Sequence, residues 1–384
     1  LSKNNSMNSI QDINIFLKNL FTENNFQYVD LPLVYNSEVF YETSGEDIRR
    51  RMFSFTNNSG DEMCLRPDLT IPTCKHFLEN INKFENGQLC YSGPVFRSSL
   101  TSTEQSLELN QSGIEIIYKD SSKISNYEKE FQAINLAIET INQIGINDFS
   151  IRISSISLFN LFINSLDLPQ RWKQRLLRHF YRRDYFDKLL NRISDGVGYD
   201  KERKSNIIRD VFGDDKIVNE EIKDILLNED QLKTGSRTID EIASRFNLKS
   251  ESVVSSKQGK EIQKVINEFL SLNGPIQSID DQMNKFINDF DIQRFDVGQE
   301  MLNQLSSNLI KISAKPIYFD CDFGHSIEFY DGIIFEITND LNSDVLISGG
   351  RYDKLLNALE DKDQFSAVGF ATNNNNILKA LTNV

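Results

Sequence analysis

Strand patterns in this chain are confined to its two outer thirds, which a long helical stretch separates. Apolar and β-branched residues form strand-like runs in GQLCYSGPVFR (87–97) and LELNQSGIEIIY (107–118), and such runs return at KPIYFDCDF (315–323). From Leu158 to Ile310 the apolar spacing is helical and glycine is scarce. We therefore predict an α+β protein in which residues 1–157 and 311–384 build one discontinuous core. Residues 158–310 are predicted to form a helical insertion domain.

Local patterns in the first third predict its elements. The apolar stripe of SIQDINIFLKNLF (9–21) predicts an amphipathic helix with Ser9 as its N-cap. FQYVDLPL (26–33) reads as an edge strand or bend because it carries Pro32. EMCLR (62–66) reads as a strand, and Pro67 suits the first turn of a following helix. The runs 87–97 and 107–118 predict an antiparallel hairpin with a long polar loop.

The insertion and the last third have their own signals. Thr238 and Glu241 have the spacing of a capping box within the helical stretch. Further strands are expected in KPIYFDCDF (315–323) and in HSIEFYDGIIFEIT (325–338). The glycine pair in SGG (348–350) predicts a tight turn before a short helix from Tyr352. The strand FSAVGF and a final helix follow, and together with the first third they predict an antiparallel sheet.

Composition excludes several classes of protein. Of 384 residues, 39% are hydrophobic and 26% charged, which is typical of a globular chain rather than a fibrous or disordered one. No apolar run approaches the roughly 18 residues of a membrane span, and the start LSKNNSMNSIQ is too polar for a secretory signal. We therefore expect a cytoplasmic protein without a membrane partner.

Cysteine, histidine and net charge exclude further kinds of site. The four cysteines form no CxxC pair and there are only three histidines, so neither a disulfide, a metal site nor a cofactor is expected. The 42 Lys and Arg against 56 Asp and Glu give a net charge of −14, which disfavours nucleic acid as a partner.

One strongly basic run contrasts with this acidic balance. RWKQRLLRHFYRR (171–183) places its charges around Trp172, Leu176 and Phe180 on a helix. It could be a face for tRNA, but a solvated helix or a contact with an acidic partner is the interpretation that the net charge favours.

Polar side chains gather on the predicted strands of the first third. They comprise Arg66, Asp68 and Thr70 in LRPDLT, Arg97 at a strand end, and Gln111 with Glu115 in NQSGIE. Carboxylates and amides that converge on a sheet would suit a ligand with an ammonium or imidazolium group. From the spacing alone, separate surface positions on strands are the favoured interpretation, because short polar runs on strands are common.

The order of six segments resembles the catalytic core of histidyl-tRNA synthetase and its paralogues. These segments are LRPDLT, CYSGPVFR, NQSGIE, EFYDGIIFE, SGGRYD and AVGFA, which run from Leu65 to Ala371. The stretch LPLV with Pro32 is similar to motif 1 of class II synthetases, where that family dimerises, and CYSGPVFR is similar to motif 2. The resemblance implies a class II aminoacyl-tRNA synthetase-like core with an antiparallel sheet.

The resemblance also implies a binding site for histidine. The family's histidine-binding positions fall on Asp68 (usually a glutamate), Thr70, Gln111, Glu115 and Tyr330. The implied arrangement holds the amino group of histidine with Asp68, Thr70 and Gln111, and its imidazole with Glu115 and Tyr330. Arg97 and His325 are further candidates for the same site.

Positions that would hold ATP in an active synthetase differ in this chain. Ser99 stands where the family has an acidic residue, and no Lys or Arg lies between Arg97 and Lys119. His325 and Asn376 stand where the family has arginines that contact the reacting carboxylate and the adenine. Losing a buried charged contact costs on the order of 2–5 kcal/mol, so we expect adenylation to be lost and no catalytic residues to remain. Only eight residues follow Asn376, so no anticodon-binding domain is expected.

A histidine site without adenylation resembles the regulatory subunits of ATP phosphoribosyltransferase, to which SRTIDEIASRF (236–246) is also similar. The resemblance implies a non-catalytic protein of the first step of histidine biosynthesis. It would activate a short catalytic subunit and transmit feedback inhibition by histidine, as a homodimer within a hetero-oligomer. The alternative is a divergent or split histidyl-tRNA synthetase, and a synthetase paralogue with another substrate would equally need the missing arginines.

Overall fold

A computed structural model describes residues 7–43, 46–81, 87–98, 107–119, 127–196, 254–312, 315–324, 329–359 and 365–382. The chain divides into two compact units. The first comprises Leu1–Phe159, Leu272–Asn284 and Val297–Val384, and the second comprises Asn160–Ser271 and Lys285–Asp296.

In the first half of the chain the described elements are α1 (Ile10–Glu23), β1 (Gln27–Tyr28), β2 (Val34–Asn36), α2 (Glu38–Thr43), α3 (Glu46–Arg51), β3 (Ser54–Thr56), β4 (Glu62–Leu65), α4 (Thr70–Glu79), β5 (Gly87–Phe96), β6 (Glu108–Tyr118), α5 (Glu128–Ile144), β7 (Phe149–Ser155), α6 (Ile156–Ser165), α7 (Gln170–His179) and α8 (Arg183–Ser194). In the second half they are α12 (Ser256–Leu270), β8 (Asn273–Pro275), α13 (Ile276–Phe290), α14 (Asp296–Ile312), β9 (Ile317–Asp320), β10 (Ile333–Asn339), β11 (Val345–Arg351), α15 (Asp353–Leu359), β12 (Ser366–Asn373) and α16 (Asn374–Thr382).

The first unit is built on one large sheet whose described strands have the order β1-β5-β6-β12-β11-β10-β7-β9-β8. Its centre, from β5 to β7, is entirely antiparallel, whereas β1 pairs with β5 and β7 with β9 in parallel. Strands from the first and last thirds of the chain are interleaved in this sheet. Strand β6 lies beside β12, and β7 lies beside β10. This confirms the predicted α+β class and the single sheet shared by both ends of the chain.

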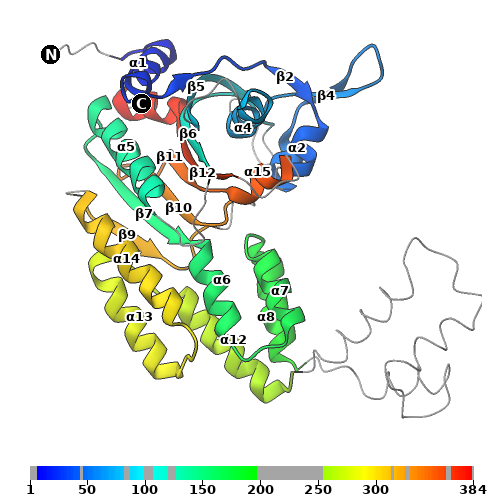
Figure 1. Cartoon of the computed structure of the whole chain (residues 1–384), viewed down its shortest axis with the longest axis vertical. Coiled ribbons are helices and arrows are strands. Elements are labelled where there is room, and N and C mark those ends of the chain that lie inside the picture. The colour runs from blue at the N-terminus through cyan, green and yellow to red at the C-terminus, as the bar shows by residue number, and fades with distance from the viewer. Residues whose placement is uncertain are drawn as a thin grey trace, which may run out of the picture. The chain divides into compact units, whose positions relative to one another are not determined.

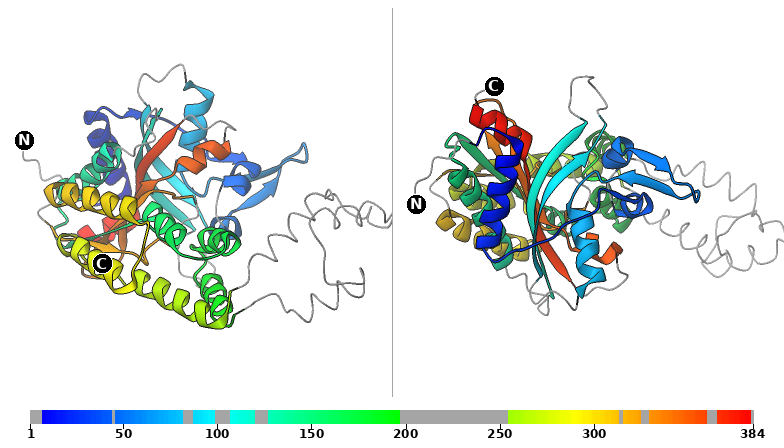
Figure 2. Two further views of the ribbon diagram at one scale, coloured as in Figure 1. Left: turned by 60° about the horizontal axis from the view of Figure 1, so that its bottom comes forward. Right: turned by 90° about the horizontal axis from the view of Figure 1, so that it is seen from above.

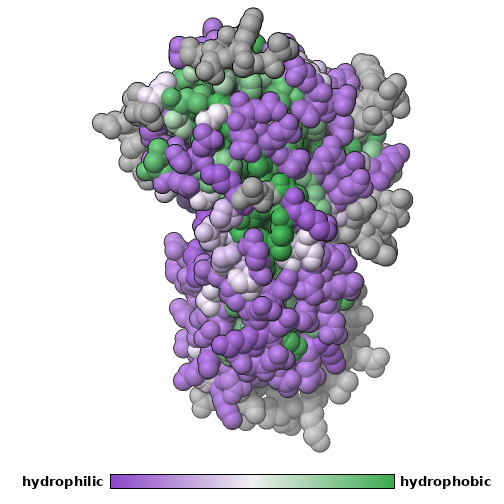
Figure 3. Space-filling model, turned by 90° about the vertical axis from the view of Figure 1, so that its left-hand side faces the viewer, coloured by the Kyte–Doolittle hydropathy of each residue, from purple (hydrophilic) through white to green (hydrophobic). Residues whose placement is uncertain are grey.

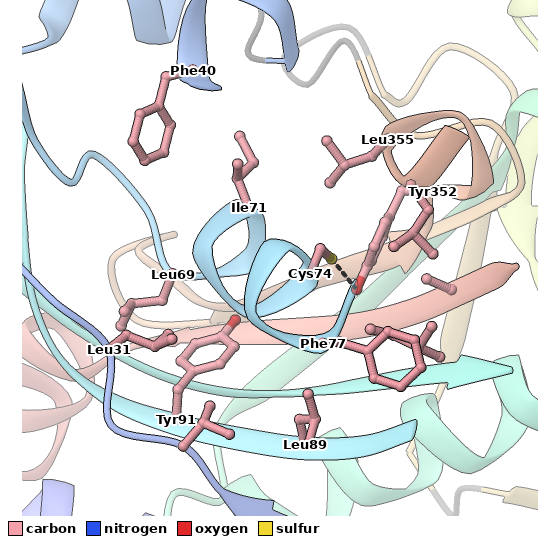
Figure 4. Packing of buried hydrophobic residues seen from close by; sticks show 14 of the residues in the cluster. Leu31, Phe40, Leu69, Ile71, Cys74, Phe77, Leu89, Tyr91, Tyr352 and Leu355 are labelled. Atoms are coloured by element: carbon pink, nitrogen blue, oxygen red, sulfur yellow. Dashed lines mark hydrogen bonds between the residues drawn. The ribbon is translucent and has the colours of Figure 1, made fainter. Parts of the chain in front are cut away.

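Helices cover both faces of this sheet (Figures 1 and 2). Helices α1, α5 and α16 lie against one face, and α4 and α15 lie against the other. The face beneath α4 and α15 carries a buried apolar cluster that includes Leu69, Ile71, Phe77, Leu89 and Leu355 (Figure 4). The small sheet β2-β4-β3 lies in the same unit.

Several local predictions are confirmed. Helix α1 begins after Ser9, whose hydroxyl accepts a hydrogen bond from the Asp12 N–H as part of a capping box. Strands β5 and β6 form the predicted hairpin. The strand expected at 26–33 is shorter than predicted: β1 ends at Tyr28 and Pro32 lies beyond it. Pro32 instead offers its carbonyl oxygen to the buried guanidinium of Arg66, at 3.1 Å. The proposed capping box of Thr238 and Glu241 lies outside the described residues.

The predicted turn at the SGG segment is wrong. Gly349 and Gly350 lie inside β11, between β10 and β12. A Cβ atom at Gly349 would lie 2.6 Å from the Phe335 side chain, and one at Gly350 would lie 2.9 Å from the Tyr330 ring. The glycines are therefore needed for close packing on the two faces of a central strand, not for a turn.

Helix α4 begins at Thr70, three residues after the predicted start at Pro67. The carboxyl group of Asp68 accepts a hydrogen bond from the backbone N–H of Ile71 at 2.9 Å, which satisfies one of the free donors of the first helical turn. Asp68 therefore lies buried at the helix start, and its position follows from this capping role.

The two units do not follow the predicted boundary of the insertion. The predicted stretch 158–310 contains β8, which pairs with β9 at the edge of the large sheet, and α14, which also belongs to the first unit. The second unit is helical where it is described, and its core contains a phenylalanine cluster. In that cluster Phe162 and Phe269 are stacked with ring centroids 3.9 Å apart.

The face shown in Figure 3 is mostly hydrophilic. None of the helices that the structure describes is long and apolar enough to cross a bilayer.

Candidate functional site

Strand β6 carries two of the predicted site residues on one face. Gln111 and Glu115 are four residues apart, so their side chains leave the strand on the same side. Glu115 is 1% exposed and faces the helices α4 and α15. The opposite face of β6 lies towards α1, so the site occupies only one side of the sheet.

Two tyrosines hold the carboxyl group of Glu115. The Tyr91 hydroxyl on β5 donates to Oε1 at 3.0 Å, and the Tyr352 hydroxyl, just before α15, donates to Oε2. The Tyr91 hydroxyl also lies 3.3 Å from that of Thr70. Figure 4 shows both tyrosines among the buried side chains around α4, with the Cys74 thiol directed at the Tyr352 oxygen. We call Asp68, Thr70, Tyr91, Glu115, Tyr330 and Tyr352 the polar cluster.

A glycine on the neighbouring strand makes room for Glu115. Gly369 pairs with Glu115 across β12 and β6, and a Cβ atom there would lie 1.8 Å from Oε2. Any larger residue at position 369 would displace the carboxyl group.

Burial sets the electrostatics of Glu115. Removal from water disfavours the charged form and raises the pKa of Glu115 to about 8, although hydrogen bonds from Tyr352, Thr70 and Tyr91 lower it. The negative charge of Asp68 adds to the rise. Burial, and after it the negative charge of Glu115, raises the pKa of Tyr330.

Asp68 has different surroundings from Glu115. Its side chain is buried, which raises its pKa, but the positive charge of Arg97 and the N–H of Ile71 oppose that rise. The Arg97 guanidinium is held in place by a 2.6 Å hydrogen bond from Nε to the carbonyl oxygen of Pro67. Arg97 therefore lies beside the Asp68 end of the polar cluster.

Two more predicted residues lie next to these groups. Tyr330 is half-buried, and its ring centroid is 6.3 Å from that of Tyr352. Gln111 is half-buried, and its side-chain oxygen is buried without a hydrogen-bond partner among the described residues. That oxygen could accept a hydrogen bond from an ammonium group of a ligand.

The structure thus brings Asp68, Thr70, Glu115 and Tyr330 together, with Arg97 beside Asp68 and Gln111 four residues along β6 from Glu115. His325 lies outside the described residues. Tyr91 and Tyr352 were not among the site residues predicted from the sequence. Both tyrosines lie in segments that carry the resemblance, Tyr352 in SGGRYD and Tyr91 in CYSGPVFR. Tyr91 is two residues along β5 from Leu89, which pairs with Glu115.

The asparagine run at the C-terminal end has structural partners. Asn374 is fully buried on the other face of the sheet and donates to Asn14 at 2.6 Å and to Ser112 at 2.9 Å. The Asn376 amide donates to the carbonyl oxygen of Val345 at 2.8 Å. The position that the resemblance assigns to an adenine-stacking arginine therefore holds a neutral side chain bonded to β11.

Among the described residues, no group of three or more His, Cys, Asp or Glu side chains could hold a metal ion. The polar cluster consists instead of two carboxyl groups, three phenols and a hydroxyl. The oxygen atoms of this set can accept hydrogen bonds from a ligand that carries an ammonium group and a protonated ring nitrogen.

Comparison with known proteins agrees with this geometry. The family model described as histidyl-tRNA synthetase matches residues 4–253 and 219–377. The ATP phosphoribosyltransferase regulatory subunit of Rhizobium rhizogenes strain K84 is 29% identical over 354 residues, which covers 89% of this chain and 90% of that protein. The protein of the same name from Sinorhizobium fredii strain NGR234 is 28% identical over 351 residues, 89% of each chain.

Solved structures show the same fold. An ATP phosphoribosyltransferase regulatory subunit/histidyl-tRNA synthetase from Bacillus halodurans aligns with a TM-score of 0.64 at 18% identity, over 99% of this chain and 83% of that one. A histidyl-tRNA synthetase from Nostoc sp. PCC 7120 aligns with a TM-score of 0.60 at 16% identity, over 100% of this chain and 75% of that one. The class II synthetase-like core is therefore confirmed, and the chain belongs to the histidyl-tRNA synthetase family.

Proposed function

We propose that this chain is a regulatory subunit of ATP phosphoribosyltransferase, which acts in the first step of histidine biosynthesis. The observation that carries the proposal is the likeness to regulatory subunits over nine-tenths of both chains. In this role the chain has no catalysis of its own. It activates a short catalytic subunit and transmits feedback inhibition by histidine, in the cytoplasm.

The polar cluster supplies the effector site in this proposal. Asp68, Thr70 and Gln111 hold the amino group of histidine, and Glu115 and Tyr330 hold its imidazole. The geometry that supports this assignment is the placement of both buried carboxyl groups beside the start of α4. Arg97 lies beside Asp68 and can reach towards the carboxylate of an amino acid. His325 remains a weaker candidate for the site.

Feedback requires linkage between this site and the catalytic subunit. Histidine must bind more tightly to a conformation of the complex with low activity than to one with high activity. A coupling of roughly 1–3 kcal/mol would give between several-fold and about 100-fold control.

The assembly in this proposal is a homodimer within a hetero-oligomer. Leu33 and Val34, in the segment similar to motif 1, are 45% and 41% exposed, so this apolar edge is open to a second copy. Leu33→Glu is expected to reduce the dimer fraction in light scattering.

The direct test is the activity of a co-expressed short catalytic subunit, with and without this chain, over a histidine titration. We expect activation by the chain and its suppression by histidine. Glu115→Ala should abolish the suppression while the complex still forms in size-exclusion chromatography. Unchanged inhibition in the Glu115→Ala complex would remove Glu115 from the effector site.

The second candidate function is that of a divergent or split histidyl-tRNA synthetase, which the family model favours by its description. Asn376 speaks against it, because its neutral amide bonds to Val345 and cannot stack on adenine as arginine does. Histidine-dependent exchange of pyrophosphate into ATP discriminates the two functions. Exchange without any effect on the phosphoribosyltransferase would favour the synthetase.

A further inference from the structure

Glu115 is surrounded by neutral groups and by one other acid. The groups that act on it come from β5, from α4 with the loop before it, and from the residues around α15. They are Tyr91, Thr70, Asp68 and Tyr352. The Cys74 thiol and the Tyr330 phenol also face this group. None of these described groups carries a positive charge. The positive charge of Arg97 lowers the pKa of Asp68 instead.

The packing around Glu115 leaves its carboxyl group poorly solvated. Only 1% of the residue is exposed, and the backbone of Gly369 approaches so closely that even a Cβ atom would not fit. A buried carboxylate without a neighbouring cation takes up a proton when its hydrogen bonds cannot replace its hydration. The rise in the pKa of Glu115 to about 8 agrees with this packing.

We propose that Glu115 is protonated in the unliganded protein at neutral pH, and that bound histidine shares this single proton with it. This inference rests on the proposed function, because it assumes that the ligand is histidine. Besides the ring N–H, the free carboxylic acid and a neutral imidazole together hold one titratable proton. The bound pair also holds one, either on the carboxyl oxygen or on the ring nitrogen, so no proton enters from solvent.

This arrangement contributes to specificity. A side chain with a permanent positive charge, such as that of arginine, would force Glu115 to release its proton to solvent. At pH 7, one unit below a pKa of about 8, this release costs about tenfold in affinity. A neutral ring with one donor and one acceptor nitrogen avoids that cost. Glu115 therefore selects imidazole over cationic side chains through its protonation state as well as through shape.

The test is a proton count during histidine binding at pH 7.0, by calorimetry of the full chain in two buffers with different ionisation enthalpies. With an imidazole pKa of about 6.5, free imidazole carries about 0.2 proton and Glu115 about 0.9, so binding should release only about 0.1 proton. An ordinary, ionised glutamate would instead give an uptake of about 0.8 proton. An uptake of that size would overturn the inference while leaving histidine binding established. Absence of binding at any pH would overturn the proposed function as well.

Glu115→Gln is the matched variant, because its amide stays neutral at every pH. The ratio of wild-type to variant affinity cancels the ionisation of the amino group of histidine. It should stay constant from pH 6 to 7.5 and fall about tenfold per unit above pH 8. A steady fall from pH 6 upwards would contradict a protonated Glu115.

Discussion

The two carboxyl groups of the polar cluster differ because only one has a cation beside it. Asp68 lies near Arg97 and caps α4, whereas Glu115 has two tyrosine hydroxyls and no cation among the described groups. The same sheet face can therefore hold one acid suited to an ammonium group and another suited to a neutral ring.

The raised pKa of Glu115 makes stability depend on pH. Folding raises this pKa from 4.5 to about 8, so the native state holds a proton that the unfolded chain loses above pH 4.5. The stability associated with Glu115 is fully present below pH 4.5 and is lost as the pH rises towards 8, by up to about 1.4 kcal/mol per unit. In thermal melts from pH 5 to 8, Glu115→Gln should gain stability relative to wild type. If the stabilities of wild type and variant changed in parallel with pH, the pKa of Glu115 would not be raised by folding.

Gly369→Ala tests the steric limit at Glu115. The new methyl group would collide with Oε2 of Glu115 and with the carbonyl oxygen of Ile114, 2.3 Å away. We expect a loss of roughly 1–3 kcal/mol in stability and of histidine response in the activity assay. Gly145→Ala is the control, because nothing lies within 4 Å there and only its positive φ is strained. A Gly369→Ala protein with normal histidine response would contradict the packing described.

At the scale of elements, the guanidinium of Arg351 ties three of them together through ion pairs. Arg351 at the end of β11 bonds to Glu130 of α5 at 2.9 Å and to Asp353 at the start of α15 at 2.9 Å. Arg351 is 12% exposed and Glu130 is 1% exposed. This pair fixes the end of β11, and the next residue is Tyr352 of the polar cluster.

Breaking this pair should therefore affect both stability and the site. Arg351→Met leaves Glu130 buried without its cation, for which we expect a cost of about 3–5 kcal/mol in chemical denaturation. The double variant Arg351→Met with Glu130→Leu removes both charges and should recover much of that loss. A double variant no more stable than Arg351→Met would show that the pair acts through its shape or its bond to Asp353.

At the scale of the whole molecule, the polar cluster belongs to one of the two compact units. Its residues come from β5, from β6, from α4 with the loop before it, from the segment before β10 and from the junction of β11 and α15, which all lie in the first unit. The basic run 171–183, which spans α7 and reaches the first residue of α8, lies in the second unit. Binding at the polar cluster can therefore be followed separately from events in the second unit.

Histidine should slow amide hydrogen exchange first in β6, α4 and the residues around Tyr352. At a histidine concentration 100 times the dissociation constant, binding stabilises the chain by about 2.7 kcal/mol. Amide exchange is slowed most in those elements whose local unfolding would disrupt the binding site. Mass-spectrometric exchange of the isolated chain measures this. Protection confined to α7 and α8 would place the histidine site in the second unit.

The sequence by itself determined the local elements and the alternation that places Gln111 and Glu115 on one strand face, because helix periodicity, caps and strand alternation are short-range properties. The order of its motifs also indicated the family and four residues that come together in the structure, namely Asp68, Thr70, Glu115 and Tyr330.

Only the tertiary structure decided that Tyr91 and Tyr352 hold Glu115 and that Gly349, Gly350 and Gly369 fill crowded strand positions. It also decided that β8 leaves the helical stretch to join the sheet. These outcomes depend on the register between strands that are up to about 260 residues apart in the sequence, such as Gln111 opposite Asn373. A one-residue change of register would turn Glu115 to the other face, and no local pattern encodes that pairing.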